Sequence, residues 1–227
     1  FFINKQSFKT YDFVEREDEY NRVIGMDYNL ASKDNTWNGS LITHKSFQPD
    51  DSKGNLASSA LIRYNTRKFN VFAKGTFIDE DFRSDLGFVR RTDLFKTLLS
   101  AERVFWPKTG IVQNHSLRYF TNIRWSPSRD FQNTDYDHQA TYEVQFNNQS
   151  QARVEFTNSY TFLFDDFDPT GTVGAVPLPE NEDYHYNNVQ FGYQSDQRQL
   201  FSYNMQSTVG RFFNGNRFSL EGSMTMR

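Results

Sequence analysis

Hydrophobic and polar residues alternate one by one along most of this chain, which is the period of a β-strand whose two faces meet different surroundings. In residues 151–161 the even-numbered side chains are apolar or aromatic except Asn158, and the odd-numbered ones are polar. The same alternation recurs in residues 21–30, 68–78, 116–126, 201–209 and 218–226. Almost no segment has the spacing of an amphipathic helix. The pattern therefore predicts an all-β protein.

The connections between the alternating segments differ regularly in length. Short ones, rich in Asn, Asp, Gly and Ser, fall at residues 32–35, 65–67, 107–110, 147–150 and 195–198. Longer ones fall at residues 48–55, 79–91, 127–137 and 165–183, and residues 210–216 are intermediate. Short connections of this composition are typical of β-hairpins. We therefore predict an antiparallel up-and-down meander of about 12 strands, with tight turns at one end and long loops at the other.

Short turns on one rim and long loops on the other are typical of bacterial outer-membrane β-barrels, whose strands of roughly 9–11 residues cross the bilayer at a tilt. The mean hydropathy of −0.76 excludes a helical membrane protein. The chain nevertheless has 24 Phe, 12 Tyr and 3 Trp. Rings near strand ends are candidates for interfacial girdles: Trp37, Phe47, Tyr64, Phe77, Trp106, Trp125, Phe164 and Tyr193. These features predict part of a transmembrane barrel in the outer membrane of a Gram-negative bacterium, surrounded by lipid and lipopolysaccharide.

Both ends of the sequence fall inside alternating segments, and residue 1 is Phe rather than Met. The residues 1–8 are expected to form a strand, as are residues 218–227. We interpret residues 1–227 as a single partial outer-membrane β-barrel domain, cut from a longer polypeptide. A sheet taken from a larger barrel need not close on itself.

Several chemistries are excluded or disfavoured by residue content. The chain has no Cys, which excludes disulfides and thiol catalysis, and its net charge of −3 gives no reason to expect nucleic acid. No Gly-x-Ser-x-Gly or phosphate-binding Gly-rich loop is present. The four histidines, which lack metal-ligand spacing, are expected to be ordinary lumen or loop residues: His44, His115, His138 and His185. We expect a non-enzymatic membrane anchor or transport-related barrel without a cofactor.

Two other functions are compatible with the same alternation. A soluble carbohydrate-binding β-sandwich also has one apolar and one polar face on each strand, and exposed rings stack on sugars. An outer-membrane hydrolase is the second alternative, and it needs catalytic side chains grouped at one rim of the strands.

Two groups of charged residues are candidate functional sites. Asp165, Asp166 and Asp168 open the longest loop, where clustered carboxylates beside a Gly turn can ligate Ca²⁺, although acidic loop residues are ordinarily just solvated. Arg90 and Arg91 lie where another long loop returns to a strand. They are candidates for a plug or constriction paired with Asp79, Asp81 or Asp85, or for ordinary ion pairs that anchor the loop. Three arginines and one glutamate on polar faces are lumen candidates that set selectivity or brace neighbouring strands: Arg118, Arg124, Arg153 and Glu155.

The alternation fails in residues 93–105, because Glu102 or Arg103 must share the apolar side. We expect a β-bulge there.

Three stretches resemble a family of Bacteroidetes-type outer-membrane β-barrels of unknown function that follow a family-9-like carbohydrate-binding module. They are residues 20–30 (YNRVIGMDYNL), 81–93 (DFRSDLGFVRRTD) and 212–220 (FFNGNRFSL), the second being the most specific. The resemblance extends over essentially the whole chain. It implies a longer protein in which a sugar-binding module precedes the barrel and further strands complete it, so that polysaccharide is a partner only through that missing module. The family supplies no catalytic motif to transfer.

Overall fold

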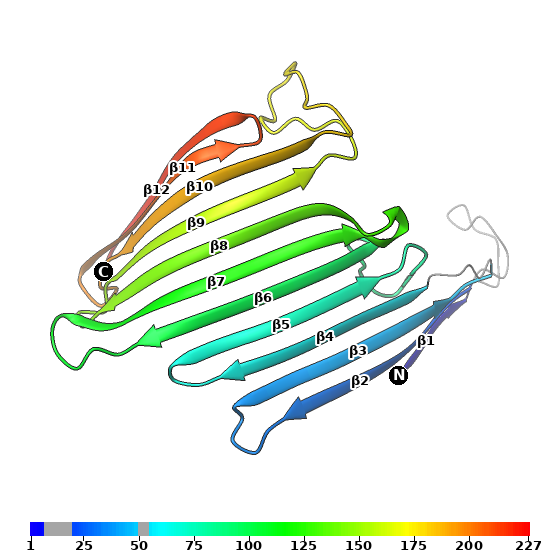
Figure 1. Ribbon diagram of the computed structural model, residues 1–227, viewed down its shortest axis with the longest axis horizontal. Coiled ribbons are helices and arrows are strands. Elements are labelled where there is room, and N and C mark those ends of the chain that lie inside the picture. The colour runs from blue at the N-terminus through cyan, green and yellow to red at the C-terminus, as the bar shows by residue number, and fades with distance from the viewer. Residues whose placement is uncertain (7–19, 50–54) are drawn as a thin grey trace. The chain divides into compact units, whose positions relative to one another are not determined.

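The structure is a computed structural model that describes residues 1–6, 20–49 and 55–227. These residues form twelve β-strands and one short 3-10 helix, Pro127–Arg129 (Figure 1). The strands are β1 (Phe2–Gln6), β2 (Tyr20–Ala31), β3 (Trp37–Phe47), β4 (Leu56–Asn65), β5 (Phe69–Ile78), β6 (Leu94–Phe105), β7 (Val112–Ser126), β8 (Gln132–Phe146), β9 (Gln151–Phe162), β10 (Asp183–Gln194), β11 (Phe201–Phe212) and β12 (Gly215–Met226). The predicted strand residues 7 and 8 and the predicted loop residues 50–54 lie outside the described residues.

The strands follow one another in the sheet in sequence order, from β1 to β12, and neighbours run antiparallel. This arrangement confirms the predicted all-β meander of about 12 strands. The pairing register keeps residues of one kind together. Phe156 of β9, for example, stands between Ala140 of β8 and Val189 of β10.

The chain divides into two compact units. Unit 1 comprises Phe1–Tyr64, Phe72–Leu98 and Arg124–Gln132, and unit 2 comprises Asn65–Val71, Leu99–Ile123 and Asn133–Arg227. Unit 1 contains β1 to β3, and unit 2 contains β9 to β12. That residues 1–227 form a single domain stays a prediction.

Within each unit, polar side chains are buried more often than hydrophobic ones, which is the reverse of the pattern in a soluble protein. Among the described residues, the buried hydrophobic side chains are only Val23, Phe82, Leu163, Leu178 and Phe213. The buried polar side chains are far more numerous, and many are small hydroxyl residues: Ser46, Ser100, Ser116, Thr121, Ser126, Thr134, Thr141, Ser150, Thr157, Ser159, Ser195, Ser202 and Thr208. We call the two surfaces of the strands the polar face, which carries most of these hydroxyls, and the apolar face, which carries the exposed rings and aliphatic side chains.

The tight turns are held by side chains that bond to nearby backbone groups, as their composition predicts. The Asp34 carboxylate accepts hydrogen bonds from Ser32 Oγ at 2.6 Å and from Thr36 Oγ1 at 2.7 Å. These bonds lower the pKa of Asp34 to about 2. Asp196 and Arg198 form a similar turn between β10 and β11, where the hydrogen bonds from Arg198 hold the pKa of Asp196 well below its usual range.

Two connections are shorter than the sequence predicts. The loop expected over residues 127–137 ends at residue 131, because β8 already begins at Gln132. The connection expected over residues 210–216 is the two-residue turn of Phe213 and Asn214. Gly210 lies inside β11 with φ +155°, and a Cβ there would lie 2.3 Å from the Asn187 carbonyl oxygen. That glycine marks a close approach of β10 and β11, not a loop.

The structure also differs from the prediction for residues 93–105, where a β-bulge was expected. β6 runs from Leu94 to Phe105 without interruption, so Arg103 stays on the apolar face. Its guanidinium lies 4.2 Å from the centre of the Phe69 ring and 5.4 Å from that of Phe105. Two aromatic faces thus give the cation a favourable place on an apolar surface, and no bulge is needed.

Candidate functional site

In unit 1, the loop of residues 79–93 is bonded to the polar face of β2 and β3. The buried Asn21 side chain donates to the Arg83 carbonyl at 3.0 Å and accepts from the Asp85 N–H at 3.0 Å. Ser46 Oγ accepts from the Arg83 N–H at 3.2 Å. Phe82, another residue of this loop, is buried. The loop is therefore fixed by backbone bonds to side chains from two strands, and it lies over their polar surface.

Ion pairs add to this attachment. Asp85 binds Lys5 of β1 at 2.8 Å and Arg83 of its own loop at 2.6 Å. Partial burial on its own would raise the pKa of Asp85, but the hydrogen bonds and positive charges of Lys5 and Arg83 outweigh it and hold the pKa below its ordinary value. The sequence suggested Asp85 as one of three carboxylates that pair with Arg90 and Arg91, whereas in the structure it pairs with Lys5 and Arg83.

The far end of the same loop is bonded to the end of β7. The Asp93 carboxylate accepts hydrogen bonds from Ser126 Oγ, from Ser128 Oγ at 2.8 Å and from the Ser128 N–H at 2.8 Å. Burial opposes ionisation of this group, and the three bonds with the charge of Arg91 lower its pKa overall. The segment carrying Arg90 and Arg91 is thus fixed at both sides.

Arg124, one of the lumen candidates, lies in a group of basic side chains in unit 1. Lys74, Arg90 and Arg124 are all near enough to Lys96 for their charges to act on its ammonium group. Lys74, Lys96 and Arg124 belong to β5, β6 and β7, three consecutive strands. The structure therefore brings two sequence candidates, Arg90 and Arg124, together with two lysines that sequence reasoning did not single out.

In unit 2 the other lumen candidates lie on the polar face of β7 and β9, as their parity predicts. Arg153 donates to Gln190 Oε1 at 3.1 Å, and Glu155 accepts from Thr141 Oγ1 at 3.0 Å. Arg153 also stands opposite Glu143 in the register of β8 and β9. Together with Gln151, Gln194, Asn204 and Gln206, it lines a polar hollow. Arg118 lies on the same polar face of β7 and is partly buried. These bonds join neighbouring strands, and the pore role of the residues stays a prediction.

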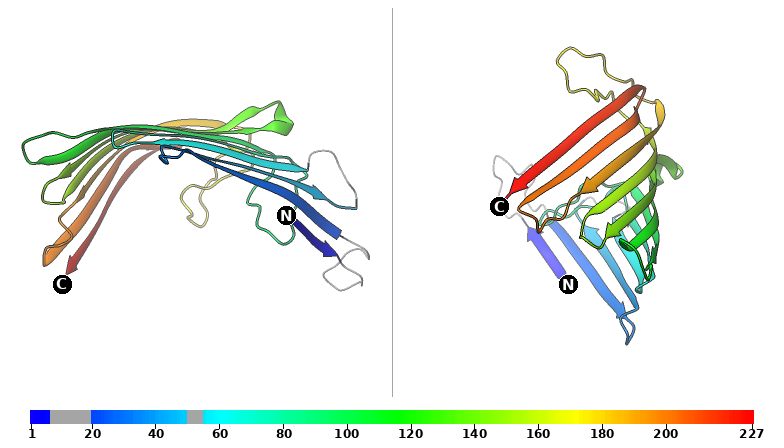
Figure 2. Two further views of the ribbon diagram at one scale, coloured as in Figure 1. Left: turned by 90° about the horizontal axis from the view of Figure 1, so that it is seen from below. Right: turned by 90° about the vertical axis from the view of Figure 1, so that its left-hand side faces the viewer.

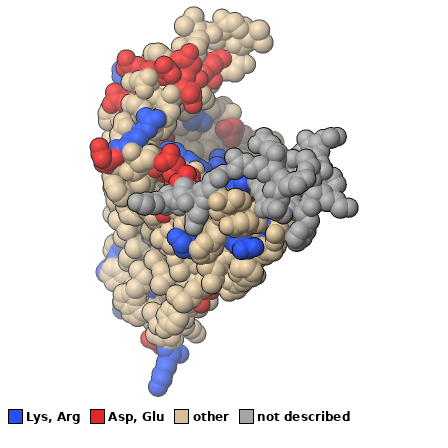
Figure 3. Space-filling view, turned by 90° about the vertical axis from the view of Figure 1, so that its right-hand side faces the viewer, with Lys and Arg blue, Asp and Glu red and all other residues tan. Residues whose placement is uncertain are grey.

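Two of the three calcium candidates, Asp166 and Asp168, accept hydrogen bonds within the loop of residues 163–182. Asp168 accepts from the Thr170 N–H and hydroxyl at 2.8 and 2.7 Å, and these bonds lower its pKa. Asp166 accepts from the Glu180 N–H at 3.0 Å across the loop, and Asp165 is exposed. In Figure 3, acidic atoms gather in the upper part of the view, where this loop lies. Among the described residues, no three His, Asp or Glu side chains are grouped so that they could hold a metal ion.

The same loop packs on its own unit through apolar side chains. Leu163, Leu178 and Phe213 form a buried cluster, against which Tyr184 and Phe212 pack. A backbone bridge joins Phe167 and Leu178, and their N–H and carbonyl groups bond in both directions. Figure 2 shows the loop leaving the surface of the strands at the ends of β9 and β10. This cluster is the main hydrophobic core of unit 2.

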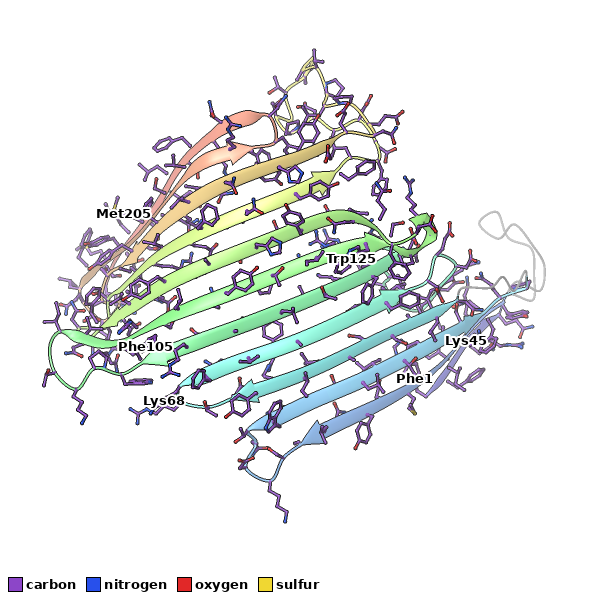
Figure 4. All side chains as sticks on the ribbon, viewed as in Figure 1. Phe1, Lys45, Lys68, Phe105, Trp125 and Met205 are labelled. Carbon is purple, nitrogen blue, oxygen red and sulfur yellow. The ribbon has the colours of Figure 1, made fainter. Side chains whose placement is uncertain are left out.

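Three histidines of unit 2 lie among rings on the apolar face, which sequence reasoning missed. His115 stacks on Phe105 with ring centres 4.9 Å apart, and Phe105 marks the tight-turn end of β6 in Figure 4. His138 Nδ1 lies 2.9 Å from both Tyr119 Oη and Thr121 Oγ1. His185 packs against Tyr160. Each of these histidines stands at a position that alternates in step with the apolar residues of its strand, and this pattern could have revealed its face. The expectation of lumen or loop positions is therefore wrong for these three.

Several of the predicted girdle rings pair with another ring or a cation near strand ends. Trp37 packs against Tyr64 with ring centres 4.8 Å apart, and Trp106 lies under the Arg67 guanidinium at 4.6 Å. Trp125 lies near the other end of the strands, where β7 leads into the connection to β8, and packs against Phe95 with ring centres 5.3 Å apart (Figure 4). Rings therefore occupy both ends of the strands.

No helix in the described part of the chain is long and apolar enough to cross a membrane. No curated protein and no solved structure matches the chain. One family matches residues 12–227, which is nearly the whole sequence. The chain, with its polar surface, its two attached loops and its ring-bearing opposite surface, therefore belongs to the family described as Domain of unknown function (DUF5916).

Proposed function

We propose that this chain is an integral segment of an outer-membrane β-barrel in a Gram-negative bacterium, acting as a membrane anchor or in transport, without catalysis of its own. The observation that carries the proposal is the distribution of exposure within each unit. On β11, Met205 is 50% exposed, whereas Ser202 and Thr208 are 3% and 4% exposed. A soluble sheet buries the opposite side chains.

The apolar face is large, and its residues remain apolar from strand to strand. In unit 2 it includes exposed apolar residues from six consecutive strands: Leu117, Tyr119, Tyr142, Val154, Phe156, Phe191, Met205, Val209, Phe218, Leu220 and Met224. A patch of this size facing water promotes association, whereas lipid chains remove the apolar surface from water. In this proposal, lipid and lipopolysaccharide surround the apolar face, and the polar face encloses water.

The rings at both ends of the strands support the same proposal. Trp and Tyr side chains favour the interface between hydrocarbon and headgroups, because one part of the ring system is apolar and another forms hydrogen bonds. Trp106 meets this description, since its indole N–H donates to the Arg67 carbonyl at 3.1 Å.

The family resemblance extends the proposal to the parent protein. A Bacteroidetes-type origin and a preceding sugar-binding module would place polysaccharide among the partners of the whole protein. The soluble sandwich is less favoured, because the described strands belong to one sheet and a sandwich needs two facing sheets.

Two neighbouring residues of β11 give a matched test. Met205→Arg places a charge on the apolar face, and Asn204→Arg places the same charge on the polar face, where Asn204 is also exposed. Near mid-bilayer we expect Met205→Arg to lower the stability of the folded chain in lipid vesicles by roughly 2–4 kcal/mol and Asn204→Arg to change it much less.

The measurement is urea unfolding of each variant in vesicles, followed by tryptophan fluorescence and by heat-modifiable gel migration. Equal losses for the two variants would contradict the proposal, as would a wild-type chain that is folded and monodisperse in water without detergent.

A further inference from the structure

A hollow on the polar face of unit 2 is lined mainly by side-chain amides. We call it the amide hollow, and it lies across β9, β10 and β11, three strands that are side by side in the sheet (Figure 1). The pairing register arranges its residues in two rows across these strands, the first of Arg153, Gly192 and Gln206 and the second of Gln151, Gln194 and Asn204. Four carboxamides and one guanidinium therefore surround a position that carries no side chain.

Gly192 leaves this space open, although its backbone does not require glycine. Its φ is not among the positive values of the chain, and its pairing with β9 and β11 continues without a bulge on both sides. The nearest described atoms to a Cβ at this position would be Arg153 Cβ and Nε, both at 3.9 Å, so no described backbone group approaches closely. Glycine weakens the interior of a strand, and one reason for its presence there is the approach of a ligand.

The amides around the hollow keep their hydrogen-bonding groups available. Among residues 1–6, 20–49 and 55–227, no side-chain hydrogen bond engages Gln151, Gln194, Asn204 or Gln206. Arg153 donates through Nη2 to Gln190 Oε1 at 3.1 Å, and its other N–H groups have no such bond within the same residues. Each carboxamide can therefore offer an NH₂ donor and a carbonyl acceptor to a ligand, and Arg153 can offer further donors.

The charges around the hollow favour a ligand without net charge. In the register, Glu143 of β8 stands opposite Arg153, and Glu221 of β12 stands opposite Gln206. Glu155 follows Arg153 by two residues on the same face of β9. These three carboxylates disfavour an anion in the hollow, whereas the guanidinium in its lining disfavours a cation.

The volume of the hollow is about 160 Å³, which is smaller than the roughly 300–1,000 Å³ of pockets for drug-sized ligands. It therefore suits one small unit. Hydroxyl groups both donate and accept hydrogen bonds, as carboxamides do. We propose that the amide hollow binds a neutral sugar ring through its carboxamides and Arg153. This inference goes beyond the membrane proposal and does not rest on it, because the hollow lies on the polar face in either setting.

Binding is tested by saturation-transfer difference NMR, which detects weak association, on the folded full chain in a detergent without a sugar headgroup. The probes are two series of matched rings: glucose, glucosamine and glucuronate, and galactose, galactosamine and galacturonate. We expect at least one neutral sugar to bind, about tenfold more tightly than the charged members of its series. Binding of neither neutral sugar overturns the proposal, as does equal or tighter binding of a charged member.

Gly192→Val fills the hollow and tests the role of the missing side chain. Because a β-branched residue favours a strand, we expect the thermal midpoint of this variant without ligand to be unchanged or raised, and sugar binding to be lost. Gly222→Val is the matched control, since Gly222 alternates in step with the exposed Leu220 and Met224 on the apolar face of β12. It should bind sugar as the wild type does. Retained binding in Gly192→Val, or a lowered midpoint, contradicts the proposal.

Gln206→Met removes one carboxamide with little change in size. Loss of one neutral hydrogen bond is expected to weaken sugar binding by about 3- to 10-fold. Gln139→Met makes the same change on the polar face of β8, outside the hollow, and should leave binding unchanged. An equal loss in the two glutamine variants, or no loss in Gln206→Met, overturns the assignment of the site. Failure of Met205→Arg to disturb vesicle stability would count against the membrane proposal and would leave these results unaffected.

Discussion

The loops of residues 79–93 and 163–182 are both attached to polar-face strand ends of their own unit, but different interactions hold them. The first is attached by hydrogen bonds and ion pairs to Asn21, Ser46 and Lys5. The second is attached by the apolar cluster of Leu163, Leu178 and Phe213. Polar attachment is directional and sensitive to pH and salt, whereas apolar attachment depends mainly on shape and area. The two loops should therefore open under different conditions.

The largest effect is expected for Leu178→Ala in the apolar cluster. Removing a buried leucine side chain leaves a cavity and costs about 2–5 kcal/mol. Leu178 is 7% exposed, and the loss should appear as faster hydrogen exchange and proteolysis of residues 163–182. Val176→Ala is the matched control, because Val176 lies in the same loop and is 90% exposed. Similar effects of the two substitutions would contradict the conclusion that the apolar cluster holds this loop.

The next effect is expected for Asn21→Ala in the polar attachment. The substitution removes one donor and one acceptor from a site that is 3% exposed, and it leaves the Arg83 carbonyl and the Asp85 N–H without these partners. We expect a loss of about 1–3 kcal/mol, seen as faster exchange in residues 79–93. Asn29→Ala, on the same face of β2 but exposed, should have little effect. Protection that survives Asn21→Ala unchanged would show that other contacts hold the loop.

Acid should distinguish the two loops by a smaller amount. Because the folded-state pKa of Asp85 lies below its unfolded value, its contribution is fully present above the unfolded pKa, about 4, and is lost as the pH falls through the lower folded value. Exchange of residues 79–93 should therefore accelerate below about pH 4, relative to its intrinsic rate, while the Leu178 cluster stays protected. Asp85→Asn should remove the part of this pH dependence that Asp85 contributes and leave the part due to Asp93, whose pKa is also lowered. A wild-type loop indifferent to acid would contradict the assignment.

The smallest effect is expected for Lys5→Gln. The Lys5 side chain is 40% exposed, so solvent screens its pair with Asp85, and the cost should be about 0.2–1 kcal/mol. High salt should weaken the wild-type attachment more than that of the variant, which keeps only the Arg83–Asp85 pair. An equal salt effect on residues 163–182 and on residues 79–93 would contradict the conclusion that the two loops are attached by different interactions.

Sequence reasoning was most successful where one local rule repeats. The alternation in residues 151–161 correctly assigned β9 and its two faces, and the turn residues correctly marked the five short connections. It correctly allowed Arg103 on the apolar side but expected a bulge there, because a cation on an apolar face looks like a break in the pattern until Phe69 and Phe105 are seen beside it. It also misplaced three histidines, because residue type outweighed parity in the interpretation.

The candidate site was only partly accessible to such reasoning. Arg90 and Arg124 were identified individually, but their meeting with Lys74 and Lys96 depends on the alignment of β5, β6 and β7 and on the path of the loop. Asp85, one of three carboxylates suggested as partners of Arg90 and Arg91, instead pairs with Lys5 and Arg83, since charge alone does not tell which of several cations lies nearest.

The sequence by itself determined the strands, their order and the division between polar and apolar faces, because side-chain direction in a strand follows from local backbone geometry. Only the tertiary structure decided how the long loops attach and which charges meet. Asn21 and Arg83 are 62 residues apart, and Asp93 and Ser126 are 33 apart. Contacts at such separations depend on the register of every intervening strand, which no local pattern records.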